Sequence, residues 1–365
     1  MIKSRIKNVL SATLLALVAA SCAEGFSGDV IPFDNIAGGI DNSKGALFVS
    51  PTGADTNAGT SPTTPFKTIG QALKVAKPGM VINLMPGDFS LRHGDEIVIA
   101  PEMSGDEGKY LTIKAYDAAK RPRIIAGGDQ FWTTLTIQAS YVIIDGIEFQ
   151  GYNQTYTESD SLAAYNYAKA SHDKTLQNVN DAAKYCTNGI SVGQKKDADP
   201  IPHHVIVRNC VIHDFPGGGL GAGKADYVTF DNNVIYNNAW YSMYANSGIS
   251  VLGSVDVDNN TTDHKICITN NTVYNNHGKI PWASTSDFRY SDGNGIIMDV
   301  NDGKSQSTYN YQGRVLVANN VSYFNGGSGI HAYHAHNIDI INNTTYHNAQ
   351  RYKDEYGEIY SHNGE

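Results

Sequence analysis

The sequence predicts an all-β protein built as a parallel β-solenoid, in which short strands coil around one apolar core. Its composition suits short strands and tight turns rather than helices, because glycine (36 residues) and tyrosine (22 residues) are abundant and only 17% of residues are charged. Two short motifs also recur beyond residue 110. Recurrence at a nearly fixed spacing is typical of stacked structural repeats.

The first motif is an alternating apolar run with an asparagine pair or its equivalent. The pair begins at Asn209, Asn232, Asn270, Asn319 and Asn342, so the steps are 23, 38, 49 and 23 residues. The second motif interleaves with it as Gly189-Ile190, Gly219-Leu220, Gly248-Ile249, Gly295-Ile296 and Gly329-Ile330. A basic repeat near 23 residues fits a coil of three short strands, with insertions in the longer steps.

The asparagines are expected at fixed corners of the coil, where each side chain can bond to the asparagine above and below. A β-propeller would repeat about every 40–45 residues, and a leucine-rich repeat would show a comb of leucines. Neither pattern is present, so the solenoid is the preferred architecture.

The charge balance narrows the classes of partner. With 27 basic and 36 acidic residues the net charge is −9, which argues against a nucleic-acid binder. The low charge also argues against a disordered or coiled-coil chain. We expect a monomer without a nucleic-acid partner.

Residues 1–21 resemble an export signal, with a basic start, a short apolar run and small residues before Cys22. This order is similar to the lipobox of bacterial lipoproteins, in which the cysteine is lipidated; an ordinary signal peptide is the alternative. Residues 22–44 are expected to be a tether, and residues 45–365 the solenoid domain. The expected location is the outer membrane or cell surface, or otherwise the periplasm or the exterior.

The domain is expected to open with a strand at 46–49, a helix and a second strand at 80–84. Thr64 would cap the helix, Pro65 fits its first turn, and Lys77-Pro78-Gly79 would stop it. Its apolar face would comprise Phe66, Ile69, Leu73 and Ala76. This helix is expected to cover the open end of the first coil and protect its strand edges.

Four insertions lengthen turns between the repeats, and the first has helical composition. They are residues 153–185, 253–264, 277–292 and 300–312. Loops of this length on a rigid coil usually build a binding wall.

Cys186, Cys210 and Cys267 are expected to be small buried hydrophobes, with a Cys186–Cys210 bridge as an open alternative. The Gly-Ile motif recurs once more at Gly357-Glu358-Ile359, and the next asparagine pair is missing. We therefore expect a fragment whose parent continues for further coils; a terminus capped by a partner or a folded-back loop is the alternative.

The segment FVSPTGADTNAGTSPTTPFKTIGQALKVAKPGMVINLMPGDF (48–89) resembles the opening of right-handed parallel β-helix proteins of the pectate-lyase-like superfamily. It is similar to the opening of family 9 polysaccharide lyases, and the repeats extend the likeness over roughly residues 45–365. The stretch 291–348 also resembles bacterial secreted β-helix proteins. The compact Asp-Asp-Gly run that supplies calcium ligands in family 9 is absent, and Asp292-Gly293-Asn294-Gly295 matches it only in part.

The resemblance implies a polysaccharide lyase that cleaves a uronic-acid glycan by β-elimination. In related lyases calcium offsets the substrate carboxylate, and an unprotonated lysine or arginine removes the neighbouring proton. Lys224, which follows a bare glycine run, is the candidate base. His331 aligns with Ser191 and Ser250 in an outward row, where it could act as an acid or base.

Carboxylates gather between residues 287 and 302. Asp287, Asp292, Asp299 and Asp302 are the expected ligands of Ca²⁺, which prefers oxygen donors. Asp292 is also a candidate catalytic residue, and with Asp299 it could form the acid pair of a glycoside hydrolase. Asp256 and Asp258 form a second, weaker cluster.

The partner expected from these residues is a polysaccharide. Aromatic faces stack on sugar rings, and several aromatic or polar side chains lie at or beside the insertions. The expected substrate-binding residues are Trp240, Tyr244, Trp282, Arg314, Tyr333 and His334. A lyase is the leading hypothesis, with a β-helix hydrolase and a non-catalytic surface glycan-binding protein as alternatives.

Overall fold

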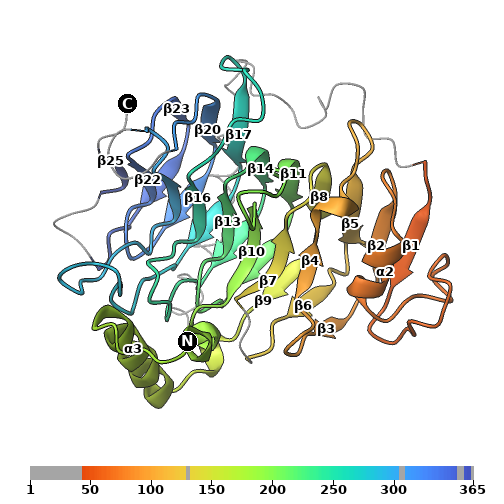
Figure 1. The fold of residues 1–365 in the computed structure, drawn as a ribbon, viewed down its shortest axis with the longest axis horizontal. Helices are drawn as coiled ribbons and strands as arrows, with labels where there is room; N and C mark the ends of the chain where they lie inside the picture. Colours follow the sequence, from red (N-terminus) through yellow and green to blue (C-terminus); the bar gives the residue numbers. More distant parts are fainter. Residues whose placement is uncertain (1–42, 129–131, 304–308, 352–356, 363–365) are drawn as a thin grey trace, which may run out of the picture. The chain divides into compact units, whose positions relative to one another are not determined.

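The computed structural model describes residues 43–128, 132–303, 309–351 and 357–362, and it confirms the right-handed parallel β-helix. Figure 1 shows its strands stacked side by side along the chain. The predicted signal segment 1–21, Cys22 and nearly all of the tether lie outside the described residues. None of the helices in the described segments has both the length and the apolar composition that crossing a membrane requires.

Three parallel sheets, which we name A, B and C, form the coil. Sheet A contains β1 (Ala46–Val49), β2 (Val81–Leu84), β5 (Leu111–Ala115), β8 (Val142–Asp145), β11 (His203–Arg208), β14 (Asp226–Asp231), β17 (His264–Thr269), β20 (Arg314–Ala318) and β23 (Ile338–Ile341). Sheet B contains β3 (Asp88–Ser90), β6 (Arg123–Ile125), β9 (Glu148–Gln150), β12 (Val211–His213), β15 (Val234–Tyr236), β18 (Thr272–Tyr274), β21 (Val321–Tyr323) and β24 (Thr344–Tyr346). Sheet C contains β4 (Ile97–Ile99), β7 (Thr133–Ile137), β10 (Asn188–Gly193), β13 (Leu220–Gly223), β16 (Ile249–Leu252), β19 (Ile296–Asp299), β22 (Ile330–Tyr333) and β25 (Ile359–His362).

The recurrent asparagine pairs are the corners between sheets A and B. From β11 onward each A–B corner is a two-residue turn, and its first residue adopts a left-handed backbone, with φ between 52° and 58°. Asparagine tolerates this conformation better than most residues. The first residues of these turns are Asn209, Asn232, Asn270, Asn319 and Asn342. The constant two-residue turn explains why this motif survives wherever the repeat length changes.

The second asparagine of most pairs points inward and joins successive coils. The Asn271 side chain donates to Asn320 Oδ1 at 3.0 Å and to the carbonyl of Phe230 at 2.9 Å, and its own Oδ1 accepts from Asn233 Nδ2 at 3.0 Å. The expected asparagine ladder is therefore confirmed. It satisfies backbone groups at the corner that burial would otherwise leave unpaired.

The core is built from alternate residues of the strands, as the apolar periodicity predicts. Val205, Val207, Ile266 and Ile268 are at most 1% exposed. On the outer face of sheet B a ladder of stacked rings adds lateral contacts, with centroids 4.8–4.9 Å apart and planes within 6° of parallel. The ladder comprises His213, Tyr236, Tyr274, Tyr323 and Tyr346.

The predicted capping helix is present as α2 (Ile69–Val75), and it packs on β1 and β4 of the first coils. Its predicted start is wrong, because Thr68 caps it by accepting from the Gln71 amide at 3.2 Å. Phe66 instead pairs with β1, where its amide donates to the Phe48 carbonyl at 2.9 Å. This pairing keeps the Thr64–Phe66 segment out of the helix.

The first insertion is helical, as its composition predicts. It forms a 3-10 turn η2 (Asn153–Thr155), helix α3 (Glu158–His172) and a 3-10 helix η3 (Val179–Tyr185). Another 3-10 turn, η1 (Pro101–Met103), lies earlier in the chain, outside this insertion. Thr157 and Asp160 cap α3 reciprocally. Cys186, Cys210 and Cys267 are free thiols, so the Cys186–Cys210 bridge is not formed, and the first two are buried as expected.

Candidate active site

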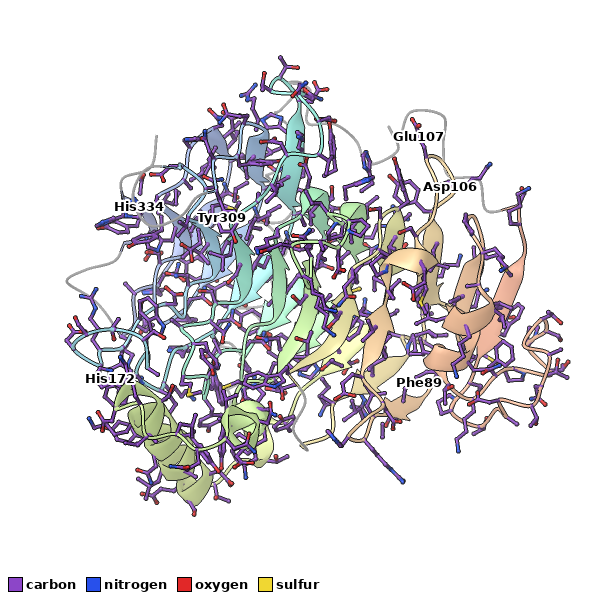
Figure 2. All side chains as sticks on the ribbon, viewed as in Figure 1. Phe89, Asp106, Glu107, His172, Tyr309 and His334 are labelled. Atoms are coloured by element: carbon purple, nitrogen blue, oxygen red, sulfur yellow. The ribbon has the colours of Figure 1, made fainter. Side chains whose placement is uncertain are left out.

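The long insertions border sheet C. Those that precede its strands lie at the B–C corner and include α3, η3 and the connections 237–248 and 275–295. Those that follow its strands lie at the C–A corner and include residues 194–202 and 253–263. Figure 2 places His172, at the end of α3, on one side of sheet C and Tyr309 on the other. The outer face of sheet C is thus a floor between two walls, the arrangement in which loops on a rigid scaffold carry binding sites.

Over its central coils the floor carries only small side chains or none. The strand register places Ser191, Gly221 and Ser250 side by side in one outward row. In the next row Gly193 faces Gly223, and a Cβ at Gly193 would lie 2.4 Å from the Gly223 carbonyl oxygen. A hollow of about 310 Å³ opens over this part of the floor. A ligand can therefore approach the backbone closely here.

His331 lies in the predicted row, but it is buried rather than exposed. It pairs across the sheet with Ile297, which follows Ser250 in the same row. Its ring packs against Tyr333 and Tyr360, with centroids 5.7 and 5.1 Å away, and it is only 4% exposed. Burial and nearby His362 lower the pKa of His331 to about 4. The outward row is therefore covered at this coil, because neighbouring rings pack over His331.

Asp292 and Asp299 form an interacting acid pair at opposite ends of β19. Asp292 lies in the segment before the strand with φ 57°, and Asp299 is its last residue. Burial, with repulsion from Asp299, raises the pKa of Asp292 to about 8, and burial raises the pKa of Asp299 to about 6. Asn294 Nδ2 donates to Asp292 Oδ1 at 3.5 Å. Both residues are half-buried as a whole, and burial of the carboxyl groups is the first cause of both shifts.

The four predicted calcium ligands do not converge. Asp287 is exposed, and its carboxylate lies 3.8 Å from Arg289, whereas Asp302 is buried 3.6 Å from Nδ1 of His334. Among the residues that the structure describes, no three histidine, cysteine, aspartate or glutamate side chains are grouped as metal ligands. Asp287 and Asp302 are thus engaged in other contacts, and of the four carboxylates only Asp292 and Asp299 interact with each other.

Lys224 lies beside the floor, as predicted, but it is held as a cation. Its ammonium nitrogen is 2.6 Å from Asp197 Oδ1 and 5.9 Å from the centroid of Tyr309. The hydrogen bond from Lys224 to Asp197, followed by contact with Tyr309, raises its pKa. This environment opposes the unprotonated state that a catalytic base needs.

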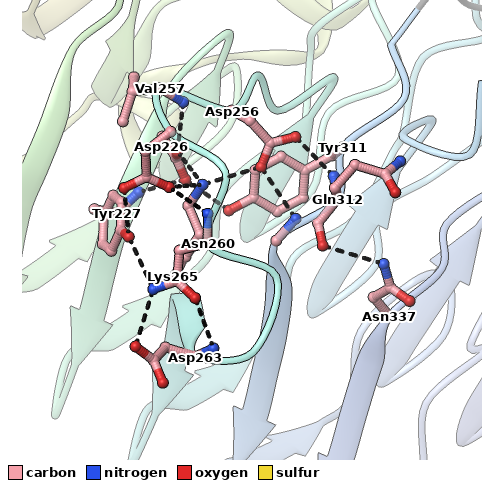
Figure 3. Close-up of polar contacts among 12 residues, drawn as sticks. Asp226, Tyr227, Asp256, Val257, Asn260, Asp263, Lys265, Tyr311, Gln312 and Asn337 are labelled. Atoms are coloured by element: carbon pink, nitrogen blue, oxygen red, sulfur yellow. Dashed lines mark hydrogen bonds and ion pairs between the residues drawn. The ribbon is translucent and has the colours of Figure 1, made fainter.

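A buried ion cluster lies at the C–A corner (Figure 3), and it joins the predicted acidic cluster of Asp256 and Asp258 to Lys265 and Asp226, which the sequence analysis did not single out. The Lys265 ammonium nitrogen is 2.6 Å from Asp226, 3.0 Å from Asp256 and 3.1 Å from Asp258. The Tyr311 hydroxyl donates to Asp226 at 2.7 Å. Burial alone would lower the pKa of Lys265, but hydrogen bonds to the three carboxylates outweigh it and raise the pKa. The second acidic cluster of the sequence is therefore neutralised by a lysine.

The predicted substrate-binding residues divide between the two walls. Trp240, Tyr244 and Trp282 belong to the B–C wall. Tyr244 is 39% exposed, and the centroid of its ring lies 6.0 Å from that of Trp132. Tyr333 and His334 lie at the end of β22, at the C–A side. Arg314 does not join them, because it begins β20 of sheet A and pairs with Asp339.

A larger hollow, of about 890 Å³, lies elsewhere. It is lined by residues around α2, β3 and β4, including Asp55, Leu73, Phe89 and Arg92. None of the predicted site residues borders it. The acid pair at β19, whose two carboxyl groups have raised pKa values, is the stronger candidate for chemistry.

Comparison with known proteins agrees with this fold. No protein with a curated description shows significant similarity. Among solved structures, pectate lyase Pel9A is 17% identical with a TM-score of 0.47, covering 80% of this chain and 69% of its own. A rhamnogalacturonan lyase is 14% identical (TM-score 0.42; 80% and 75% covered), and the GH136 lacto-N-biosidase from Eubacterium ramulus is 15% identical (TM-score 0.42; 86% and 48% covered). Residues 47–363 match the family described as the Pel9A-like right-handed beta helix region, so the chain belongs to that family.

Proposed function

We propose that the protein is a glycoside hydrolase that cleaves a polysaccharide bound along sheet C, with Asp292 and Asp299 as its paired acids. The observation that carries this proposal is the interaction of the two carboxyl groups, whose pKa values are both raised and differ from each other. Glycoside hydrolysis usually employs one protonated and one ionised carboxyl group. Environments that separate the pKa values of two neighbouring acids assign those roles.

Asp292 is the proposed general acid. Because its pKa lies near 8, it holds a proton at neutral pH and can protonate the leaving oxygen of the glycosidic bond. Asp299, with a pKa near 6, is largely ionised at pH 7. It can act as the nucleophile, or as the base that activates water. These roles predict that activity falls as the pH drops below about 6 and again as it rises above about 8.

The floor and its walls suit a carbohydrate chain. Serine and glycine in the central rows leave room for sugar rings near the backbone, and the Ser191 and Ser250 hydroxyl groups can bond to sugar hydroxyls. Tyr244 and Trp132 offer aromatic surface at the B–C wall. A glycan that runs across the strands of sheet C would meet these groups in successive coils.

A β-eliminating lyase is the second candidate, since the family carries the name of a pectate lyase. Its candidate base, Lys224, is paired with Asp197, which disfavours that role. The calcium that the lyase would use stays a prediction. Titration calorimetry with Ca²⁺ on wild type and Asp292→Ala tests it, because a lost binding site in the variant would support calcium and unchanged stoichiometry would exclude this site.

The function is tested with a panel of neutral and uronic polysaccharides. We expect new reducing ends without the ultraviolet absorbance of an unsaturated uronide, and unchanged activity in EDTA. Asp292→Asn and Asp299→Asn should each lower turnover by about 100-fold or more. Asp287→Asn is the matched control, because Asp287 is exposed and lies outside the pair. Unsaturated product would favour the lyase, and full activity of both asparagine variants would refute the assigned acids.

We also propose that the protein is exported and anchored through a lipid on Cys22. The basic start, the apolar run and the small residues before the cysteine support this. Expression with labelled palmitate should mark the wild type and leave Cys22→Ser unlabelled. An unlabelled wild type that is still cleaved near residue 21 would indicate an ordinary signal peptide.

A further inference from the structure

The cluster around Lys265 at the C–A corner contains a lysine and an aspartate that are withdrawn from solvent together (Figure 3). The side chains of Lys265 and Asp226 are each 0% exposed, and the Lys265 ammonium nitrogen lies 2.6 Å from Asp226 Oδ2. Lys265 is the second residue of β17, and Asp226 is the first residue of β14, which pairs with β17 in sheet A. A bond between the two side chains would therefore join successive coils.

Both oxygens of the Asp226 carboxylate are held by hydrogen-bond donors. Oδ1 accepts from the Tyr311 hydroxyl at 2.7 Å and from the Tyr227 amide at 2.9 Å. Oδ2, the oxygen that Lys265 reaches, also accepts from the Val257 amide at 2.8 Å. Two fixed donors on Oδ1 resemble an oxyanion hole, because they would stabilise the negative charge that develops there when a nucleophile attacks the carboxyl carbon.

A second carboxylate lies beside the lysine as a proton acceptor. Asp256 Oδ1 is 3.0 Å from the Lys265 ammonium nitrogen. The Gln312 and Gly313 amides fix this carboxylate by donating to it at 2.7 and 3.1 Å. The Asp256 side chain is 20% exposed, whereas that of Asp258, 3.1 Å from the same nitrogen, is 47% exposed. Asp256 is therefore the better enclosed of the two acceptors.

We propose that Lys265 and Asp226 react with each other to form an intramolecular isopeptide bond, an amide between the two side chains. The lysine nitrogen attacks the carboxyl carbon of Asp226, so that a carbon–nitrogen bond forms and the bond from that carbon to Oδ2 breaks. Two protons of the ammonium group pass in turn through Asp256 to Oδ2, which leaves as water. One ammonium and one carboxylate thus become one neutral amide and one water, without an oxidant, a reductant or a cofactor.

The lysine must lose a proton before it can attack. Burial alone would lower the pKa of Lys265, but hydrogen bonds to three carboxylates raise it, so the resting lysine is a cation. The reactive form arises when one proton moves from Lys265 to Asp256 along their hydrogen bond. This transfer converts an ion pair into two neutral groups, and burial favours neutral over charged groups. Burial also opposes hydrolysis of the amide, because water would have to enter a site without exposed surface.

The ion pair between Lys224 and Asp197 is the matched control within the same chain. Its nitrogen and oxygen are also 2.6 Å apart, but the two side chains are 35% and 89% exposed. Water stabilises both charges there, so the neutral, reactive form of the pair is not favoured. The control thus offers the same two chemical groups at the same separation without the enclosure.

Peptide mapping by mass spectrometry tests the bond in the purified full-length protein. After denaturation and proteolysis, the peptide that contains Asp226 should be joined to the peptide that contains Lys265. The mass of the joined product should be lower by one water than the sum of the two peptides. The joined product should accumulate as freshly purified wild type is incubated, while the peptides that contain Lys224 and Asp197 stay separate.

Two variants test the assigned roles through the rate of bond formation. Tyr311→Phe removes one donor from Asp226 Oδ1 and should slow the reaction by about 100-fold. Asp256→Asn removes the proton acceptor and should also slow it by about 100-fold, whereas Asp258→Asn should slow it less. The rates are compared in protein whose circular dichroism is native, so that lost stability does not account for them. Lys265→Met should form no joined peptide, and the other variants keep the test available if it fails to fold.

The outcome is independent of the proposed hydrolysis, because no glycan is needed. Wild type that stays unjoined after prolonged incubation in the folded state would overturn the isopeptide bond. An equal yield of joined peptides at Lys224 and Asp197 would overturn the role of burial. A bond from Lys265 to another carboxylate, or an unchanged rate in Tyr311→Phe, would show that the donors on Asp226 do not direct the reaction and would overturn the assignment.

Discussion

Lys265 and Lys279 are both withdrawn from solvent, yet their surroundings give them opposite properties. Lys265 lies at the C–A corner among three carboxylates, and its pKa is raised. Lys279 lies at the B–C wall on an indole ring, with no ion pair to a carboxylate of the described segments, and its pKa is lowered to about 8. The two aspartates Asp226 and Asp292 also differ in their electrostatic surroundings. Asp226 is paired with the Lys265 ammonium group, whereas Asp292 is repelled by the carboxylate of Asp299.

The comparison distinguishes charges that hold the fold from charges that remain available for chemistry. In the buried cluster at the C–A corner Lys265 is paired with Asp226, Asp256 and Asp258, so the cluster ties β14, β17 and the loop 253–263 together (Figure 3). Around Asp292 and Lys279 the charges are only partly compensated, which costs stability and is typical of functional sites. The four variants below test whether compensation is the true difference.

Lys265→Met should have the largest effect on stability. It leaves Asp226, whose side chain is fully buried, without its cation, and breaking a buried pair typically costs about 3–5 kcal/mol. Urea denaturation of the two proteins measures the change in the free energy of unfolding. Lys224→Met, which breaks an exposed pair, should leave the midpoint unchanged. An equally small effect at Lys265 would show that this cluster does not hold the corner.

Tyr311→Phe should have an intermediate effect, because it removes one hydrogen bond from the same buried carboxylate. The hydroxyl donates to Asp226 Oδ1 at 2.7 Å, and hydrogen bonds to charged groups contribute about 1.5–3 kcal/mol. Tyr227→Phe is the control, since its hydroxyl donates to the more exposed Asp258 and should matter less. If both variants unfold at the same urea concentration, the burial of Asp226 does not make its hydrogen bond to Tyr311 more stabilising than the exposed bond between Tyr227 and Asp258.

Asp292→Asn should change how stability depends on pH. The folded pKa near 8 lies above the unfolded value of 3.8, so the folded protein holds a proton that the unfolded chain releases. Wild-type stability should therefore fall as the pH rises from about 4 through 8, by about 1–2 kcal/mol after allowance for solvent access. The asparagine variant should lack this component in denaturation series at pH 5, 6.5 and 8. Parallel curves for wild type and variant would contradict the raised pKa, and Asp287→Asn should match wild type throughout.

Lys279→Met should have the smallest effect, and its sign should be opposite to that of Lys265→Met near neutral pH. The folded pKa near 8 lies below the unfolded value of 10.5, so wild type loses stability as the pH falls from 10.5 through 8. Methionine should remove that loss, giving a gain of about 1 kcal/mol or less at pH 7. Denaturation at pH 7, 8.5 and 10 measures it. A marked destabilisation at pH 7 would mean that the ammonium group is compensated after all.

The sequence predicted the coil because the features that specify it are local. Each A–B corner from β11 onward begins with a left-handed asparagine, and most continue with an inward asparagine amide. The pairs therefore mark the repeat even where loops of different length separate the coils. The apolar alternation gave the inward residues, and composition placed a helix in the first insertion. The Gly-Ile motif at Ile359 likewise begins a strand, β25, which pairs with β22.

Site residues were only partly predictable from the sequence. Asp292 and Asp299 stood out because they are close along the chain, and the register of His331 was correct. Its burial was not predictable, because Tyr360 of the next coil supplies part of the cover. The ion pair of Lys224 was not predictable either, because its partner, Asp197, comes from a loop 27 residues away in the sequence.

What the sequence by itself determined is the repeating corner and, through it, the solenoid with walls of inserted loops. What only the tertiary structure decided is which charges are compensated. Lys265 meets Asp226 from a different coil, and Lys279 meets Arg351 from a connection two coils later. Electrostatic interactions depend on distance and burial in space, whereas sequence spacing fixes distance only within one turn of the coil. The pKa values that define the candidate site therefore arise from the stacking of coils.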